Sequence, residues 1–209
     1  MTDLRREPVT TRLLDGDDLQ QVVVALARAF YPDPVFGMFA RGPLHEHHQL
    51  ADVFLAFARD AAPFRQIYVA EAGDRVVGAA LWLPPEGMPR STRRETMLNA
   101  RAARVLATGR NRVTGFRLLD AIDKVHPKEP HWYLFLLGTD PLMQGRGIGG
   151  QLMRPVLERC DRDGLPAYLE TQKESNLAFY ERHGFALERK IEVRGAPPVW
   201  TMRREPAAP

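Results

Sequence analysis

Gln144-Gly145-Arg146-Gly147-Ile148-Gly149 is the segment of this 209-residue sequence that is most informative about the fold class. An apolar, aromatic-rich run at 132–137 precedes it and helically spaced apolar residues follow it, so we expect the loop to join a strand to a helix. Glycines let an anion approach closely, and backbone N–H groups at a helix N-terminus attract negative charge. The loop lacks both the Gly-Lys-Ser/Thr ending of a nucleotide P-loop and the full dinucleotide pattern. It predicts a phosphate-binding loop of another kind, with a plain glycine-rich turn as the alternative.

A second motif, Asn176-Leu177-Ala178-Phe179-Tyr180-Glu181-Arg182-His183-Gly184-Phe185, begins 27 residues after Gly149. Asn176 and Tyr180 are four residues apart, so they share one face of a helix. Together the two motifs resemble the GCN5-related N-acetyltransferase (GNAT) superfamily, whose acetyl-coenzyme A loop reads Gln/Arg-x-x-Gly-x-Gly/Ala. The stretches 126–134, 169–171 and 179–182 are similar to those of the puromycin N-acetyltransferase family, and the likeness covers about residues 126–204.

This resemblance implies an α/β fold with a single mixed, mostly antiparallel sheet, splayed central strands and helices on both faces. It also implies acetyl-coenzyme A as the donor, with the pantetheine arm in the gap between the parted strands and the pyrophosphate on the loop N–H groups. The cofactor-binding residues that it implies are Leu137, Gly138, Thr139, Gln144, Gly145, Arg146, Gly147, Ile148, Gly149, Gly150 and Asn176.

The implied chemistry is attack of a neutral amine on a thioester, which needs a base because amines are largely protonated at neutral pH. The family's acid position, which protonates the leaving thiolate, falls on Tyr180; the alternative is a tyrosine that packs a helix against the sheet. Glu170 interrupts an apolar run at the end of a predicted strand, so it is either the base or half of a structural ion pair. His126 and His131 are further candidates for the base.

Two other side-chain groups carry no predicted chemistry. His45, His47 and His48 cannot all lie on one face of a helix, and no acidic or cysteine partners accompany them, so we expect no metal site. Cys160, the single cysteine, falls on the inward face of its helix and is expected to be a core residue. With no nucleophile placed to carry the acetyl group, direct transfer in a ternary complex is expected.

The acceptor predicted from the resemblance is a primary amine of a small molecule, such as an aminonucleoside-type antibiotic. The expected walls of its pocket are the stretch 31–39, with Tyr31, Phe36 and Phe39, and a helical insert at about 90–125. A protein N-terminal or lysine acetyltransferase is the alternative enzyme, and it would need an open, shallow groove. A non-catalytic acyl-coenzyme A sensor is the alternative outside the enzymes.

Composition bounds the remaining possibilities. The length fits one domain over residues 1–204, with a substrate-side half at 1–125, a cofactor and catalytic half at 126–204, and a tail at 205–209. The net charge of +3 includes a basic run between Arg90 and Lys124, but the run has a single aromatic residue, Phe116, and no pattern of interleaved aromatics, so no nucleic-acid partner is expected. No apolar run approaches about 18 residues and no signal peptide is visible, so a cytoplasmic protein without a membrane partner is expected. A homodimer is left open.

Hydrophobic periodicity and turn residues predict the other elements. Strands are expected at 9–13, 67–72, 76–83 and 167–171, helices at about 19–30, 45–61 and 176–183, a helical insert at 92–125, and a final hairpin of 185–193 with 199–203.

Overall fold

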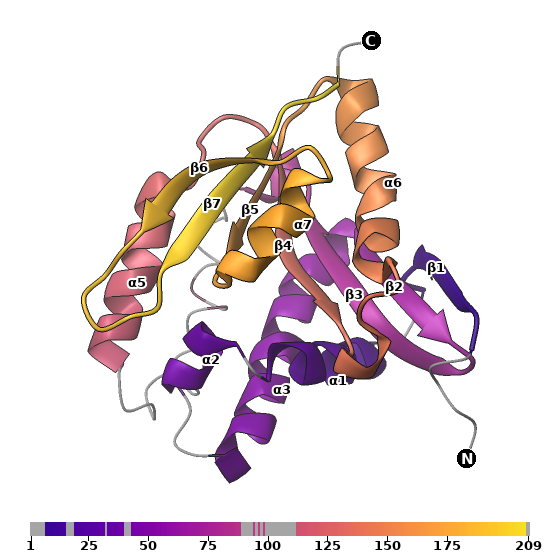
Figure 1. Cartoon of the computed structure of the whole chain (residues 1–209), viewed down its shortest axis with the longest axis horizontal. Coiled ribbons are helices and arrows are strands. Elements are labelled where there is room, and N and C mark those ends of the chain that lie inside the picture. Colours follow the sequence, from indigo (N-terminus) through magenta and orange to yellow (C-terminus); the bar gives the residue numbers. More distant parts are fainter. Residues whose placement is uncertain are drawn as a thin grey trace.

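The computed structural model of the chain describes residues 7–15, 19–31, 33–39, 43–88, 94, 96, 98 and 112–207, with the backbone alone at 37–39, 43–49 and 112. Its seven strands form one sheet in the order β1-β2-β3-β4-β5-β7-β6 (Figure 1). Every neighbouring pair is antiparallel except β4 and β5, which are parallel. The predicted mixed, mostly antiparallel sheet is therefore confirmed.

Among the described residues up to Gly87, the chain supplies the strands β1, β2 and β3 of this sheet and the helices α1, α2 and α3. The prediction for 9–13 is confirmed at both ends, and the predicted hairpin forms with its second strand one residue longer at the start. A six-residue helix that the sequence analysis did not predict follows Asp33. The bounds are β1 Val9–Leu13, α1 Leu19–Phe30, α2 Pro34–Phe39, α3 Pro43–Ala61, β2 Ile67–Ala72 and β3 Arg75–Leu83, with short 3₁₀ turns at Ala62–Phe64 and Pro85–Gly87.

The C-terminal part supplies four strands and the helix that follows the glycine loop. The strand before the loop is two residues longer than predicted, and the predicted helix at 176–183 is an α-helix only over its middle five residues. Half of the predicted insert at 92–125 lies outside the described residues. The bounds are α5 Arg112–Val125, β4 Trp132–Thr139, α6 Ile148–Asp163, β5 Ala167–Thr171, α7 Leu177–Glu181, β6 Ala186–Ile191 and β7 Val199–Arg204, with 3₁₀ turns at Pro141–Met143 and Glu174–Asn176.

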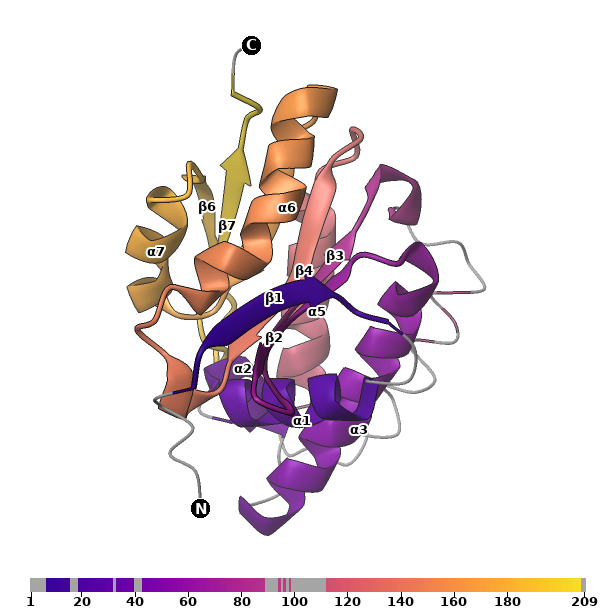
Figure 2. The same ribbon diagram turned by 90° about the vertical axis from the view of Figure 1, so that its right-hand side faces the viewer.

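Helices cover both faces of the sheet, as predicted. Figure 2 shows α6 and α7 on one side and α1 and α3 on the other. The first layer buries Leu152, Met153 and Cys160 of α6 against the sheet, and the second buries Leu26 of α1 with Phe54 of α3. The helix α5 packs near the far edge, where Leu118 contacts Val199 and Ile191. Within the described ranges, no helix is both long and apolar enough to cross a membrane.

The central strands part as predicted. β4 and β5 pair at only three positions, the last being Leu134 with Leu169, although β4 continues to Thr139. On its other side β4 carries a bulge, because Leu81 pairs with Leu136 while Trp82 pairs with Leu134. The residue skipped between them, Phe135, and its neighbour Leu136 therefore face the same side. From Phe135 onward the edge of β4 that faces β5 makes no strand pairing.

Candidate active site

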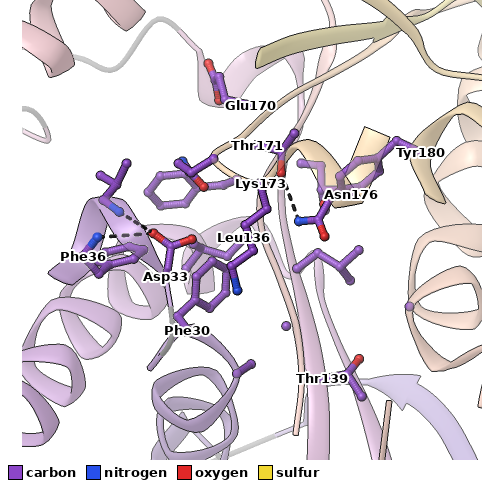
Figure 3. A pocket seen from close by; sticks show the side chains of 18 of the residues that line it. Phe30, Asp33, Phe36, Leu136, Thr139, Glu170, Thr171, Lys173, Asn176 and Tyr180 are labelled. Carbon is purple, nitrogen blue, oxygen red and sulfur yellow. Dashed lines mark hydrogen bonds between the residues drawn. The ribbon is translucent and has the colours of Figure 1, made fainter. Parts of the chain in front are cut away.

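A cleft of about 1230 Å³ opens where β4 and β5 part and runs from the glycine loop to the aromatic side chains of α1, α2 and α3 (Figure 3). The end of β5 and the start of α7 together form one of its walls. Most of the residues selected from the sequence line it. These are Phe36, Leu137, Gly138, Thr139, Gln144, Gly145, Gly147, Ile148, Gly149, Gly150, Glu170, Asn176 and Tyr180.

Two predicted residues, Arg146 and Tyr31, are not brought to this cleft, and a third, Phe39, lies outside the described side chains. Arg146 turns toward the N-terminal segment, where its guanidinium donates to the carbonyl oxygen of Glu7 over 2.8 Å. Tyr31 is 38% exposed and is not a lining residue. The side chain of Phe39 lies outside the described part of the structure, so its predicted contact with substrate stays a prediction.

The glycine loop has the conformation that its sequence predicts. Gly145 and Gly147 have φ angles of +78° and +73°, which L side chains rarely adopt, and a Cβ at either would meet no atom within 4 Å. Gly147 is the residue immediately before α6. Asp140, which the sequence analysis did not select, anchors the start of the loop, because its carboxylate accepts the N–H of Leu142 at 2.9 Å and contacts Arg28 at 3.3 Å.

Gly138 proves to be a packing requirement as well as a cleft residue. A Cβ there would lie 2.9 Å from Cβ of Ala29 and 3.0 Å from Cδ2 of Leu26, so only glycine lets α1 pack this closely against β4. Gly149 and Gly150 are covered in the same way from the α7 side, because a Cβ added to them would lie 2.9 Å from the Phe179 ring and 2.6 Å from the His183 ring, respectively. These glycines therefore set how closely the helices approach the cleft.

Asn176 and Tyr180 both reach the cleft from the motif that follows β5. Nδ2 of Asn176 donates to Oγ1 of Thr171 over 3.0 Å, which leaves its amide oxygen for another partner (Figure 3). Tyr180 is 7% exposed, and burial raises the pKa of its hydroxyl above the ordinary value of 10. At neutral pH this side chain is a phenol that can donate a proton.

Glu170 lies beside the two histidines that the sequence analysis kept as alternative bases. Its Oε1 is 3.3 Å from Nδ1 of His126, whose Nε2 is 3.2 Å from Nε2 of His131. Nδ1 of His131 in turn contacts the carbonyl oxygen of Glu129 at 2.8 Å. Desolvation lowers the pKa of the buried His131. The three candidates for the base thus form one connected cluster, and Tyr133 and Tyr168 pack against the His126 ring.

The far end of the cleft is aromatic with one buried carboxylate. The rings of Phe30, Phe36 and Phe54 lie 5.0–5.5 Å apart by centroid, and Phe57 contacts Phe135 at 4.8 Å. Asp33 is 5% exposed, and its Oδ1 accepts the N–H groups of the first turn of α2 (Figure 3).

Burial raises the pKa of Asp33, which the sequence analysis missed. The signal that could have found it is the pair Asp33-Pro34, because aspartate is a favoured N-cap residue and proline a favoured first residue of a helix. The same signal would have predicted α2.

The other reactive side chains offer no alternative site. Cys160 is fully buried, and desolvation raises the pKa of its thiol to about 12, so it is a core residue as predicted. No group of three metal-ligating side chains occurs among the described residues. The side chains of His45, His47 and His48 lie outside that set.

Comparison with known proteins identifies the family. The model of the Acetyltransferase (GNAT) family matches residues 23–185, and the chain belongs to this family. It is 34% identical over 88 residues to the uncharacterized N-acetyltransferase C550.08 of Schizosaccharomyces pombe, a match that covers 40% of this chain and 36% of that protein. The chain therefore spans well under two thirds of that relative.

Two solved structures have the same fold. A histone acetyltransferase HPA2 and related acetyltransferase from Corynebacterium glutamicum superimposes with a TM-score of 0.70 at 24% identity, covering 96% of this chain and 98% of that one. Arylalkylamine N-acetyltransferase 2 from Aedes aegypti gives 0.62 at 14% identity, covering 94% and 98%. The chain is thus a member of the Acetyltransferase (GNAT) family and has the fold of these two structures.

Proposed function

We propose that the protein transfers the acetyl group of acetyl-coenzyme A directly to the primary amine of a small molecule with an aromatic body, a description that includes aminonucleoside-type antibiotics. The observation that carries this proposal is a continuous cleft that extends from the parted strands, past Glu170, to its aromatic end. We call this end, lined by Phe30, Phe36 and Phe57, the aromatic chamber. The residues from 126 to 204 would bind the donor and perform the chemistry, while those from 1 to 125 would select the acceptor.

The donor end of the cleft fits a diphosphate followed by an extended amide-bearing arm. The open space beside Gly145 and Gly147 lets backbone N–H groups approach an anion, and α6 contributes the positive end of its dipole. The part of β4 from Leu136 to Thr139, which has no paired position with β5, supplies backbone groups that can pair with the amides of the arm. The amide oxygen of Asn176 would accept a further hydrogen bond.

The acceptor end fits an aromatic cation. The aromatic rings offer apolar surface and negative ring faces to an ammonium-bearing ligand. Four acidic side chains also line the cleft on this side, which favours a positively charged amine over a neutral or anionic molecule. They are Asp33, Asp120, Asp123 and Glu170.

In the proposed chemistry, one proton transfer takes place at the attacking amine nitrogen and another at the leaving sulfur. Glu170 would take a proton from the ammonium, so that the neutral amine can attack the carbonyl carbon of the thioester. A backbone N–H of β4 near Leu137 would stabilise the oxyanion that develops. As the carbon–sulfur bond breaks, Tyr180 would give its proton to the sulfur and regain one from the nitrogen by way of solvent.

A panel of acceptors tests this proposal. Thiol release from acetyl-coenzyme A should be greatest with arylalkylamines or aminonucleosides and small with peptides that carry a free N-terminus or a lysine. Transfer to peptides alone would instead support the alternative of a protein acetyltransferase, and donor binding without any transfer would support an acyl-coenzyme A sensor.

The division of labour has its own test in Phe36, which lines the chamber but not the donor end. Phe36→Ala should raise KM for the amine several-fold and leave the Kd of acetyl-coenzyme A within about twofold. An equal loss of both affinities would contradict the assignment of substrate choice to the N-terminal half.

A further inference from the structure

Three buried titratable side chains are connected in series from the cleft, which Glu170 and His126 both line, to a backbone carbonyl. The side chains of Glu170 and His126 are 6% and 11% exposed, and His131 is 2% exposed. Three contacts connect them in series: Glu170 Oε1 to His126 Nδ1, His126 Nε2 to His131 Nε2, and His131 Nδ1 to the carbonyl of Glu129. We call these three side chains the Glu170 cluster.

The contact between His131 and the carbonyl oxygen of Glu129 determines where the hydrogens lie in the other two contacts. A carbonyl oxygen can only accept, so Nδ1 of His131 carries a hydrogen. A neutral imidazole has one N–H, and desolvation favours the neutral form of His131, so its Nε2 is an acceptor. The contact between the two Nε2 atoms is then a hydrogen bond only if His126 donates from its Nε2.

This assignment leaves Nδ1 of His126 without a hydrogen when the ring is neutral. Its lone pair then faces the Glu170 oxygen at 3.3 Å, and an ionised carboxylate has no hydrogen to offer either. Three hydrogen bonds need three protons, whereas two neutral imidazoles and a carboxylate together supply two. The Glu170 cluster is therefore fully bonded only when it holds one extra proton between Glu170 and His126.

Without that proton, the arrangement is unfavourable in either tautomer of His126. If His126 carries its hydrogen on Nε2, the lone pair of its Nδ1 faces the Glu170 carboxylate. If it carries the hydrogen on Nδ1, the lone pairs of the two Nε2 atoms face each other at 3.2 Å. Burial strengthens both repulsions because little water screens them. Binding one proton removes the conflict.

We propose that His126 shares the proton that Glu170 takes from the acceptor amine, and that His131 is a positioning residue that strengthens this base by fixing the tautomer of His126. The proposal rests on the proposed function of Glu170. The ammonium loses one proton to the Glu170–His126 pair, whose charge changes from −1 to zero. The amine nitrogen then forms the bond to the thioester carbon, the carbon–sulfur bond breaks, and the second nitrogen proton balances the one that the sulfur receives.

Other charged or titratable groups surround the cluster and are unchanged in the experiments that follow, apart from the control at Glu129. Tyr133 of β4 and Tyr168 of β5 pack against the His126 ring, and the Tyr168 hydroxyl also interacts electrostatically with Glu170. Asp123 of α5 lines the same cleft, and Glu129 and Arg203 act electrostatically on His131.

The pH dependence of kcat tests the positioning role. Activity should rise with pH as the Glu170 cluster loses its extra proton. In His131→Phe, His126 is free to donate from Nδ1 to an ionised Glu170, so the midpoint of this rise should move to lower pH by about half a unit or more. The plateau should also fall several-fold, because a weaker base accepts the amine proton less readily.

A matched control is Glu129→Gln, which removes a charge beside His131 but keeps the main-chain carbonyl that His131 contacts. This variant should keep the midpoint of the wild-type protein. A His131→Phe enzyme that loses activity equally at every pH, with its midpoint unmoved, would overturn the proposal in favour of a structural role.

Nitrogen-15 NMR of the wild-type chain, labelled at histidine, tests the proton positions without any substrate. The expected result at neutral pH is His131 protonated at Nδ1 and His126 protonated at Nε2. His131 protonated at Nε2, or His126 protonated at Nδ1 alone, would overturn the proposal even if His131→Phe does not fold. Correct tautomers in a protein that acetylates no amine would instead contradict the proposed function and leave the proton-holding cluster intact.

Discussion

At the scale of single residues, some side chains of the cleft belong to recognisable sequence motifs, and others can be assigned a role only from their contacts in the structure. Tyr180 and the loop glycines are of the first kind. The sequence also selects Glu170 as a candidate base, but only the structure shows that it contacts His126, which is 44 residues away in the sequence. Substitutions at Tyr180 and Gly147 test residues that belong to the sequence motifs.

Tyr180→Phe tests the proposed acid. The variant keeps the buried ring and loses the hydroxyl, so we expect the fold to be retained and kcat to fall about 10²-fold, roughly 2.7 kcal/mol of transition-state stabilisation. Single-turnover rates should be measured, because slow product release would hide the effect in the steady state. A folded variant with more than half of the wild-type single-turnover rate would show that Tyr180 only packs.

Gly147→Val tests the loop, and the chain offers Gly164→Val as a control. Both glycines flank α6, have φ near +70° and leave open space for a Cβ, so both substitutions should cause similar backbone strain. Only Gly147 faces the cleft, so only its variant should raise the Kd of acetyl-coenzyme A, by about tenfold or more, equal to about 1.4 kcal/mol. Calorimetry that finds equal effects for the two would remove the loop from the binding site.

At the scale of secondary-structure elements, a helix cap and a close helix–strand contact position the walls of the cleft. Gly138 permits α1 to lie against β4, and the bulge at Phe135 turns two successive side chains toward the aromatic chamber. The capping carboxylate of Asp33 holds the first turn of α2, which carries Phe36. The third prediction concerns this cap.

Asp33→Asn should preserve the cap, because asparagine caps helices as well as aspartate does. Burial raises the pKa of Asp33, so the folded state binds its proton more tightly than the unfolded state. The contribution of this group to stability is therefore fully present below pH 3.8 and is lost as the pH rises through the folded pKa. The variant should thus have the higher urea midpoint at pH 7, with the difference closing toward pH 3.8. A variant less stable at pH 7 would show that the ionised carboxylate is stabilised by its surroundings.

At the scale of the whole molecule, one sheet carries both halves of the site, and its two parts are joined in the middle by only three paired positions of β4 and β5. A ligand that fills the gap beyond Leu134 would connect the two parts again. The last prediction follows from this geometry.

Acetyl-coenzyme A should raise the melting temperature by about 5–10 °C at a concentration of roughly one hundred times its Kd, which corresponds to about 2.7 kcal/mol. Adenosine 3′,5′-bisphosphate lacks the arm that would fill the gap, so at the same concentration it should shift the melting temperature much less. Equal shifts from the two ligands, measured by differential scanning calorimetry, would show that the gap between the strands is not used.

Features that depend on residues close together along the chain could be predicted from the amino-acid sequence. The glycine loop needs only its own glycines and the helix after it, and the strands and α1 follow from the periodicity of their apolar residues, so these were predicted almost to the residue. The family resemblance added the parted strands, which the register of β4 and β5 confirms.

Tertiary structure alone decided which polar groups meet. The pairing of Glu170 with His126 depends on how α5 and β5 dock, and Arg146 pairs with the carbonyl of Glu7, 139 positions away. Such contacts require the orientation and register of separate elements, which no local pattern encodes. The same reason explains why Tyr31, adjacent to a well-predicted helix, lies outside the cleft while Asp33, two residues later, lies inside it.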